Sequence, residues 1–276
     1  MSESTVAILA IGNEILLGDV VNSNTQWLAK RLRLRGASVV HVAIVRDQLE
    51  EIERELAHAR TYRPRLLVTT GGLGPTDDDR TVAAVAGALG LELREHDAAL
   101  TQVAFFYREL AARGRVPSAE LSPSRRKMSL LPEGATPLAN HVGAAPGIYL
   151  VHDGLAILLL PGVPEEMADI FDGAFAPILT ELVGDGGFFE IERFARSSDE
   201  SLLAPMLRLV AERHPSTYVK SRAEVFGRSP WFRVTISASA GRLEDATVRV
   251  NAAEADLRAT LHDHGIELSE RRPEAA

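Results

Sequence analysis

The spacing of apolar residues in the first half of the chain alternates between two patterns, which predicts strands separated by helices. Short apolar runs are typical of strands buried on both faces, and three stand at Thr5–Ile11, Ala37–Val45 and Arg65–Thr70. Each run is followed by apolar residues spaced as on one helical face: Trp27, Leu28 and Leu32; Leu49, Ile52, Leu56 and Ala59; Val82, Val85 and Leu89. Strands joined by crossover helices run parallel, so this pattern predicts an α/β fold.

Polar residues at the expected helix starts are typical of helix caps. Ser23 and Asn24 are expected to cap the first helix and Asp47 the second. A further helix is expected over Ala98–Arg113. The segment Val116–Gly147 is rich in Pro, Ser and Gly, which predicts an irregular surface segment.

The later part of the chain changes in character. Ile148–Leu160 is expected to form a hairpin that turns at Asp153-Gly154, and Pro161–Phe171 to turn into a helix. Beyond residue 175, the order strand, helix, two strands and helix predicts a small α+β domain of the split βαβ kind. We therefore expect an α/β domain over residues 1–175, an α+β domain over 176–266 and a disordered tail over 267–276.

Composition narrows the classes of protein. Lys and Arg number 30 against 38 Asp and Glu, a net charge of −8, which argues against broad binding to nucleic acid or an anionic membrane. The chain has no cysteine, so disulfides, thiol nucleophiles and cysteine-zinc sites are excluded. No basic and apolar leader opens the chain, and apolar runs such as Leu155–Leu160 are far shorter than a bilayer span. We expect a cytoplasmic protein.

The loop after the third strand combines glycines with acids. Gly71, Gly72 and Gly74 let a backbone bend sharply and approach a ligand, and the helix that follows presents N–H groups suited to a phosphate. The next acids, Asp77–Asp79, repel one another and would repel a phosphate. A divalent cation of the Mg²⁺ class would resolve this conflict, because it binds one or two carboxylates together with phosphate oxygens. The alternative is that the acids only cap the helix.

Other motifs at the same edge of the sheet admit two interpretations. Glu14 follows the first strand between glycines and could bind a metal or a ligand, or a loop amide. The segments Asn140–Gly147 and Pro161–Met167 are typical of turns and of a helix start. The chain has no H-E-x-x-H or G-x-S-x-G motif, so a zinc or serine hydrolase is not indicated.

Taken together, five ordered motifs resemble one family. GNEILLGDVVNSN, VRDQLEEI, TTGGLGPTDDDRT, NHVGAAPG and LPGVPEEM are similar to the molybdopterin-binding domain of molybdenum-cofactor biosynthesis proteins (MoaB/Mog-like), in the version of the CinA family of competence/damage-inducible proteins. The resemblance implies a three-layer αβα domain with a mostly parallel sheet and a homodimer. It implies a metal-dependent pyrophosphatase acting on ADP-ribose, and a related domain fused to FAD synthase is associated with FAD hydrolysis. The amidase domain of longer CinA proteins is not expected here. Leu73 stands where pterin-binding enzymes usually have Thr, which favours the CinA version.

The resemblance implies functional roles for Asp79, Thr81 and Asp47 and for the glycines Gly71, Gly72 and Gly74, and the loops around them supply the other candidate residues. Asp79, Asp78, Asp47 and Glu14 are the expected catalytic residues, with Asp78 and Asp79 as ligands of Mg²⁺, Mn²⁺ or Co²⁺. The expected substrate or phosphate contacts are Gly12, Asn13, Thr70, Gly71, Gly72, Gly74, Thr81, Asn140, Gly143, Gly147, Pro161, Gly162 and Glu166. Lys220 is expected either to reach in from the second domain or a neighbouring subunit, or to lie on the solvated surface.

Three functions are carried forward from the sequence. The first is a divalent-metal-dependent pyrophosphatase that hydrolyses ADP-ribose or a similar dinucleotide. The second is a molybdopterin-binding or adenylyl-transferring protein, with molybdopterin as its small-molecule partner. The third is a nucleotide- or pterin-binding module without turnover.

Overall fold

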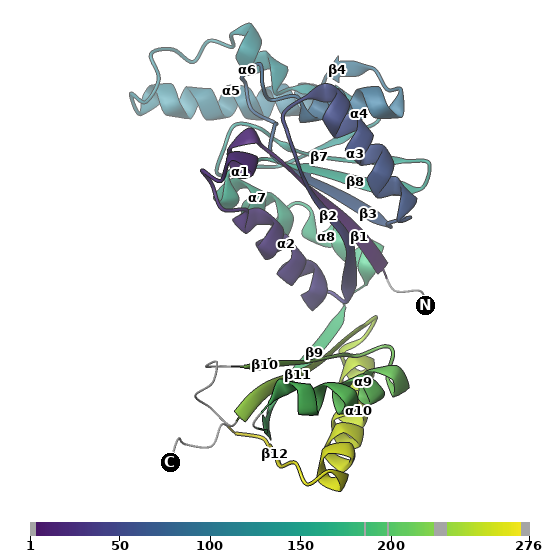
Figure 1. Cartoon of the computed structure of the whole chain (residues 1–276). Coiled ribbons are helices and arrows are strands. Elements are labelled where there is room, and N and C mark those ends of the chain that lie inside the picture. Colours follow the sequence, from purple (N-terminus) through teal and green to yellow (C-terminus); the bar gives the residue numbers. More distant parts are fainter. Residues whose placement is uncertain (1–3, 185, 198, 224–230, 272–276) are drawn as a thin grey trace. The chain divides into compact units, whose positions relative to one another are not determined.

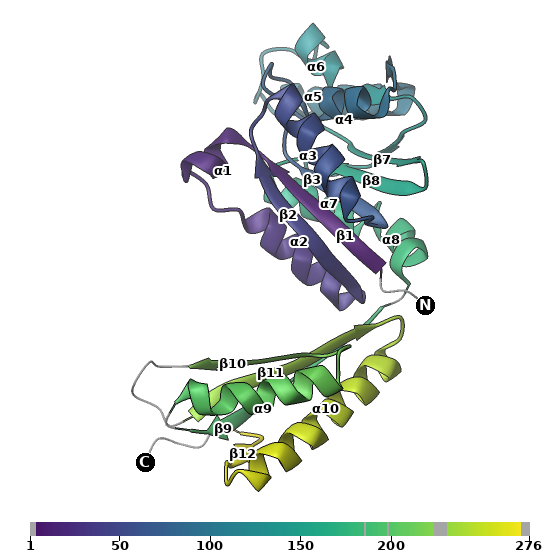
Figure 2. The same ribbon diagram turned by 45° about the vertical axis from the view of Figure 1, so that its right-hand side comes forward.

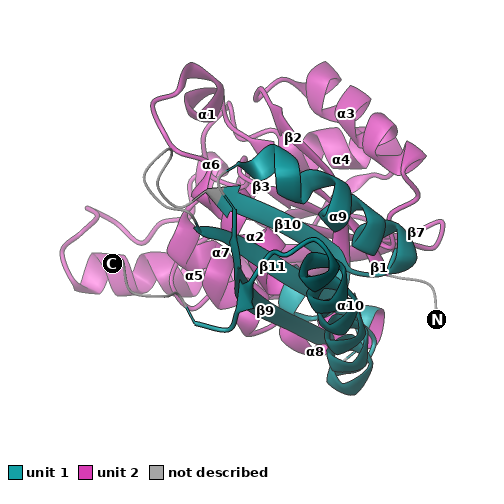
Figure 3. Ribbon diagram, turned by 60° about the horizontal axis from the view of Figure 1, so that its bottom comes forward, with its two compact units in different colours: residues 1–3, 33–37, 183–276 teal, residues 4–32, 38–182 magenta. Residues whose placement is uncertain are grey.

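A computed structural model describes residues 4–184, 186–197, 199–223 and 231–271 (Figures 1 and 2). The chain forms two compact units, coloured in Figure 3. An α/β unit comprises Ser4–Leu32 and Ser38–Leu182, and an α+β unit comprises Arg33–Ala37 and the chain from Val183 onward. The division after Leu182 lies later than residue 175, because helix α8 (Ala176–Val183) belongs to the α/β unit except for its last residue.

A six-stranded sheet forms the centre of the α/β unit, in the order β2-β1-β3-β8-β7-β6. Its strands are β1 (Ser4–Ile11), β2 (Ala37–Val45), β3 (Leu66–Thr70), β6 (Thr136–Leu138), β7 (Gly147–His152) and β8 (Leu155–Leu160). β3 pairs in parallel with β1 and β8, whereas β7 pairs antiparallel with both β8 and β6. The predicted hairpin is confirmed, since β7 and β8 are joined by Asp153 and Gly154 with positive φ angles, as a tight hairpin turn requires.

Helices cover both faces of this sheet, which confirms the three-layer α/β class. They are α1 (Asn13–Leu17), α2 (Ser23–Leu34), α3 (Leu49–Thr61), α4 (Thr81–Leu89), α5 (Asp97–Ala112), α6 (Pro123–Lys127), α7 (Pro164–Asp172) and α8. On one face, Leu9 and Ile11 of β1 share a core with α3, α4 and α5. On the other face α2 meets α7, where the ring centroids of Trp27 and Phe171 lie 5.5 Å apart. Figure 2 shows α2 and α3 on opposite sides of β1 and β2.

Two expectations about local structure in this unit were wrong. The segment 116–147 contains α6, β5 (Leu130–Pro132) and β6, and β5 pairs with β4 (Leu93–Glu95). Elements this short show no periodic pattern of apolar residues, so the content of Pro, Ser and Gly led to the wrong prediction. At the start of α2, the side chain of Asn22, not those of Ser23 or Asn24, accepts the bond from the backbone N–H of Thr25 at 3.1 Å.

The α+β unit is an antiparallel four-stranded sheet packed on two helices. Its elements are β9 (Gly187–Arg196), α9 (Glu200–Arg213), β10 (Tyr218–Ala223), β11 (Trp231–Ala240), α10 (Leu243–Asp263) and β12 (Leu268–Ser269). The strand order β10-β11-β9-β12 places β11 between β9 and β10, which is the predicted split βαβ arrangement.

The tail begins with ordered structure. Leu268 and Ser269 of β12 pair antiparallel with Ala195 and Phe194 of β9, so the expected disorder from residue 267 was wrong up to residue 271. The side chain of Leu268 is buried in the core of the unit, which explains the pairing. Residues 272–276 lie outside the described residues. Among the described helices, none is long and apolar enough to cross a lipid bilayer.

Candidate functional site

Loops that follow several strands meet at one edge of the central sheet. The strand register aligns Ala10 with Thr70 and Thr70 with Leu160, so β1, β3 and β8 end side by side. Backbone hydrogen bonds continue past the strand ends: the N–H of Gly71 donates to the carbonyl of Leu160 at 2.9 Å, and that of Gly12 to Val45 at 3.0 Å. Ligands of open α/β sheets bind outside such carboxyl ends.

Two glycines after β3 occupy positions that other residues could not. Gly71 has a φ of +105°, and an added Cβ would lie 2.0 Å from the carbonyl oxygen of Ile11. Gly72 has a φ of +71°, and its Cβ would lie 2.2 Å from Oγ1 of Thr81. The loop therefore passes against the neighbouring strand, as a backbone cradle requires.

Thr81 holds this glycine loop in place through two hydrogen bonds. Its side chain is fully buried, and its hydroxyl donates to the carbonyl of Gly71 at 2.7 Å. Its backbone N–H donates to the carbonyl of Gly72 at 3.2 Å. The geometry makes Thr81 a positioning residue for the loop rather than a group presented to a ligand.

The acids after the glycines do not cap the helix that follows. α4 begins at Thr81, its N-cap residue Arg80 makes no side-chain cap bond, and its first turn holds no acid. The carboxylate of Asp79 instead accepts bonds from the backbone N–H and the hydroxyl of Thr76, at 2.9 and 2.6 Å, and Asp78 accepts from the same hydroxyl. The capping alternative is therefore wrong, and two carboxylates converge on one point.

Cations border the same turn. Nζ of Lys127, at the end of α6, donates to the carbonyl of Thr76, and Nε of Arg80 donates to the carbonyl of Asp77 at 3.0 Å. The hydroxyl of Thr76 is the main cause that lowers the pKa of Asp78, and the charges of Lys127 and Arg80 add to it. Lys127 was missed from the sequence, because it stands 51 residues away from Thr76 along the chain. Arg80 stands inside the quoted glycine and acid motif, but no role was assigned to it.

Asp47 joins these acids from the turn after β2, which is separated from β3 by β1 in the sheet. Its Oδ2 accepts a bond from the backbone N–H of Asn13 at 2.8 Å, and α3 begins after Gln48 without a side-chain cap. The expectation that Asp47 caps α3 was therefore wrong. Partial burial raises the pKa of Asp47, and the charges of Glu14, Asp78 and Asp79 raise it further.

This set of acids has the chemistry of a hard-cation site. Carboxylates of Asp47, Asp78, Asp79 and Glu14 repel one another across the loop, and a divalent cation would offset that repulsion. These acids do not form a group of three ligand atoms within 4.8 Å of one another. Among the described residues, such a group is formed by His41, Glu55 and His58. The acids fit an ion that takes one or two carboxylates and completes its shell with substrate oxygens.

The middle of the edge is held by Asn24 and Thr70. Nδ2 of Asn24 donates to Oγ1 of Thr70 at 2.9 Å and to the carbonyl of Gly162 at 2.8 Å, and Thr70 donates to the carbonyl of Pro161 at 3.0 Å. An added Cβ on Gly162 would lie 3.4 Å from Cα of Gly71, so the loops after β3 and β8 run close together. Thr70 and Pro161 are buried and position these loops.

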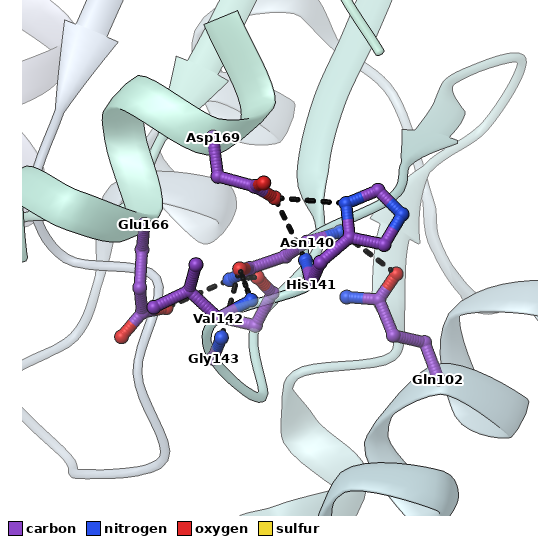
Figure 4. Close-up of polar contacts among 8 residues, drawn as sticks. Gln102, Asn140, His141, Val142, Gly143, Glu166 and Asp169 are labelled. Carbon is purple, nitrogen blue, oxygen red and sulfur yellow. Dashed lines mark hydrogen bonds and ion pairs between the residues drawn. The ribbon is translucent and has the colours of Figure 1, made fainter. Parts of the chain in front are cut away.

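Asn140 organises the loop after β6, as Figure 4 shows. Its Oδ1 accepts bonds from the backbone N–H groups of Val142 and Gly143, at 3.0 and 2.8 Å. Its Nδ2 donates to the carbonyl of Ala145 and to Oε2 of Glu166, both at 2.8 Å. All four hydrogen-bonding positions of the amide are used, so Asn140 is a clamp for the loop.

Glu166 and Asp169 extend from α7 over this loop. Burial raises the pKa of Glu166, the bond from Asn140 opposes the rise, and Glu165 adds to it. A Cβ on Gly143 would lie 1.9 Å from Oε2 of Glu166, so a larger residue there would displace the Glu166 carboxylate. Asp169 accepts bonds from the backbone N–H and Nδ1 of His141, at 2.8 and 3.0 Å (Figure 4).

His141 and Asp169 were missed from the sequence. Both stand inside or beside motifs that were singled out, and Asp169 follows Glu166 by three residues on the same helical face. Of the predicted contacts, Gly147 is buried, where its Cβ would lie 2.6 Å from Cγ2 of Ile170. Lys220 lies on β10 of the α+β unit, and its approach to the site stays a prediction.

Comparison with known proteins shows the family to which the chain belongs. A family described as "Probable molybdopterin binding domain" matches residues 7–181. The chain belongs to this family. The match includes β1 from Ala7 onward, the five other strands of the central sheet in full and the loops that form the candidate site.

Individual proteins similar to this chain cover between 64% and 95% of it. A protein of Aeropyrum pernix is 40% identical over 265 residues, which are 95% of this chain and 96% of that protein. Protein PH0439 of Pyrococcus horikoshii is 38% identical over 221 residues, 80% of this chain and 85% of that protein. The crystal structure of the protein CinA from Thermoplasma acidophilum, described as of unknown function, is 34% identical, covers 64% of this chain and 98% of that chain, and has a TM-score of 0.57.

Proposed function

We propose that the chain is a CinA-type, divalent-metal-dependent pyrophosphatase that hydrolyses ADP-ribose or a similar dinucleotide. The observation that carries the proposal is the convergence of acids on the glycine loop: Asp78 and Asp79 share the hydroxyl of Thr76, and Asp47 feels the charges of both. Four carboxylates beside a backbone cradle make little sense without a cation and an anionic ligand.

The glycine loop would hold the diphosphate. Gly72 and Gly74 leave the backbone open to a phosphate, and a Cβ on Gly74 would lie 2.6 Å from Oδ2 of Asp79. Lys127 and Arg80, which border the loop, would bind phosphate oxygens and offset part of the local negative charge.

The acids would divide the remaining tasks. Asp78 and Asp79, with Glu14, would hold a Mg²⁺-class cation, which supplies charge neutralisation on the phosphates and activation of water. Asp47 is suited to take a proton from the attacking water, because its pKa is raised above that of an ordinary aspartate. The bond from Asn13 holds its carboxylate in place for that task.

Turnover of ADP-ribose by the pure protein tests the proposal. We expect AMP and ribose 5-phosphate to form with Mg²⁺, Mn²⁺ or Co²⁺ and not with EDTA. Asp79→Asn should lower kcat at least about 100-fold, as the loss of an electrostatic group in a site does. Asp77→Asn is the matched control, because Asp77 meets Arg80 through its carbonyl rather than its side chain. Absence of AMP with all three metals would reject the proposal.

The family match supports a second function, binding or adenylylation of molybdopterin. The same cradle would then hold the terminal phosphate of a pterin. Tight binding of molybdopterin without hydrolysis of ADP-ribose would favour this function. A module without turnover would bind a nucleotide or pterin, and Asp79→Asn would weaken that binding with no activity to lose.

A further inference from the structure

A second cluster of metal-binding side chains lies outside the acidic loop. His41 stands on β2, and Glu55 and His58 stand one turn apart on the same face of α3. One ligand atom from each of the three residues lies within 4.8 Å of the other two. Nε2 of His41 and Oε1 of Glu55 are already 2.7 Å apart.

Aromatic contacts hold the two imidazole rings in defined orientations. The ring of Tyr62 stacks on that of His41 at 4.6 Å and meets the edge of His58 at 5.5 Å. The two imidazoles lie 5.3 Å apart and nearly perpendicular to each other. Side chains that packing has already ordered lose little entropy when they bind a ligand.

The donor set selects the kind of metal. Two imidazole nitrogens and one carboxylate oxygen suit Zn²⁺ and its neighbours, whereas Mg²⁺ prefers oxygen ligands and water. Two histidines and one glutamate with an open fourth position form a known class of zinc site. His41 and Glu55 are partly buried, with side-chain exposures of 15% and 24%, and His58 is exposed and leaves access for the ion.

The required adjustment is within the range of side-chain rotation. Ligand atoms around a tetrahedral zinc with bonds of about 2.0–2.1 Å lie roughly 3.3 Å apart. Nε2 of His41 and Oε1 of Glu55 would separate slightly, and His58 would close in. His58 is exposed, so its side chain has room to rotate at the surface, and Glu55 already contacts His41.

We propose that His41, Glu55 and His58 form a Zn²⁺ site that joins strand β2 to helix α3. One carboxylate and two neutral imidazoles leave a charge of +1 on a bound divalent ion, which a protein of net charge −8 accommodates readily. β2 leads into the turn that carries Asp47 and α3 leads out of it. A bound ion would therefore link the two elements on either side of that turn.

Zinc binding to the full, chelator-stripped chain tests the site. Equilibrium dialysis with Zn²⁺ alone should show one ion per chain, and the ion should raise Tm because it binds only the folded protein. Co²⁺ in its place should show the visible absorption of a tetrahedral nitrogen- and oxygen-bound ion. His58→Ala should weaken zinc binding at least about tenfold, since loss of even an outer partner of a zinc ligand has an effect of that size.

Two variants keep the test specific. His262→Ala removes an exposed histidine of α10 that lies outside the cluster, and it should bind zinc as the wild type does. Asp79→Asn should also keep this zinc, which separates the site from the acidic loop. If the wild type binds no stoichiometric zinc, or if both His58→Ala and the isosteric Glu55→Gln bind it unchanged, the proposal is overturned.

Discussion

The carboxylate of Asp47 accepts a hydrogen bond from the backbone N–H of Asn13, with 2.8 Å between Oδ2 and the nitrogen. The bond connects the turn after β2 to the loop after β1, across 34 positions of the chain. It also holds a charged side chain where Glu14, Asp78 and Asp79 repel it. The bond from Asn13 therefore keeps the carboxylate of Asp47 close to three other carboxylates that repel it.

A divalent cation should relieve that repulsion. We expect saturating Mg²⁺ to raise the free energy of unfolding of the wild type, by about 2.7 kcal/mol at 100 times its Kd. Asp47→Asn keeps an acceptor for the N–H of Asn13 but removes one charge, so it should be more stable without metal and gain less from Mg²⁺. Urea unfolding in EDTA and in Mg²⁺ measures both effects. Equal gains in the two proteins would show that Asp47 does not feel the ion.

Replacement of Gly71 separates backbone conformation from steric clash. Gly71→Ala would place a Cβ 2.0 Å from the carbonyl oxygen of Ile11, so β1 or the loop must move. Gly90→Ala is the control, because Gly90 also has a positive φ, +66°, but an added Cβ meets open space. We expect Gly90→Ala to cost about 1 kcal/mol of stability and Gly71→Ala at least about 2 kcal/mol more, with loss of activity. Chemical denaturation measures the free energy of unfolding of both variants. An equal loss of stability in the two would contradict the close approach of Gly71 to Ile11.

Removal of the Asn140 amide should loosen the loop after β6. Asn140→Ala leaves the N–H groups of Val142 and Gly143 and the carbonyl of Ala145 without their partner. We expect a loss of about 1–3 kcal/mol in the free energy of unfolding. Asn251→Ala on the exposed side of α10 should change stability by less than about 0.5 kcal/mol. Thermal or urea unfolding compares the two, and hydrogen exchange at Val142 and Gly143 should accelerate only in Asn140→Ala.

Glu166 should make stability depend on pH. Its folded-state pKa is raised above the ordinary 4.5, mainly by burial, so the folded protein binds the proton more tightly than the unfolded chain. The resulting stabilisation is fully present below pH 4.5 and is lost as pH rises through the folded-state pKa. Glu166→Gln, which cannot ionise, should therefore become more stable relative to the wild type as pH rises toward neutral. Urea midpoints of both proteins across that range measure the difference, and a constant or opposite difference would contradict the raised pKa.

Much of the fold was accessible from local pattern. The apolar runs of β1, β2 and β3 and the spacings in α3 and α4 gave the strand–helix alternation, because burial of a strand or of one helix face is recorded in nearby residues. The change beyond residue 175 indicated the α+β unit for the same reason. The short elements of 123–138 were missed, because three to five residues are too few to show a period.

The candidate site was accessible only in part. Asp79, Asp78, Asp47 and the glycines were named from motifs, and the edge of the sheet on which they meet followed from parallel strands. The sequence did not predict several contacts at this edge. Thr81 donates to the carbonyl of Gly71, and Asp47 accepts from the N–H of Asn13 rather than capping α3. Asn24 donates to both Thr70 and the carbonyl of Gly162.

By itself, the sequence determined the longer strands and helices, and which loops carry glycine beside acid, because spacing and backbone freedom are properties of neighbouring residues. Only the tertiary structure decided which partner each side chain bonds, such as the carbonyl of Thr76 for Lys127 and the carboxylate of Glu166 for Asn140. Such partners stand tens of residues apart, and their approach depends on strand order, register and helix packing, which no local pattern records.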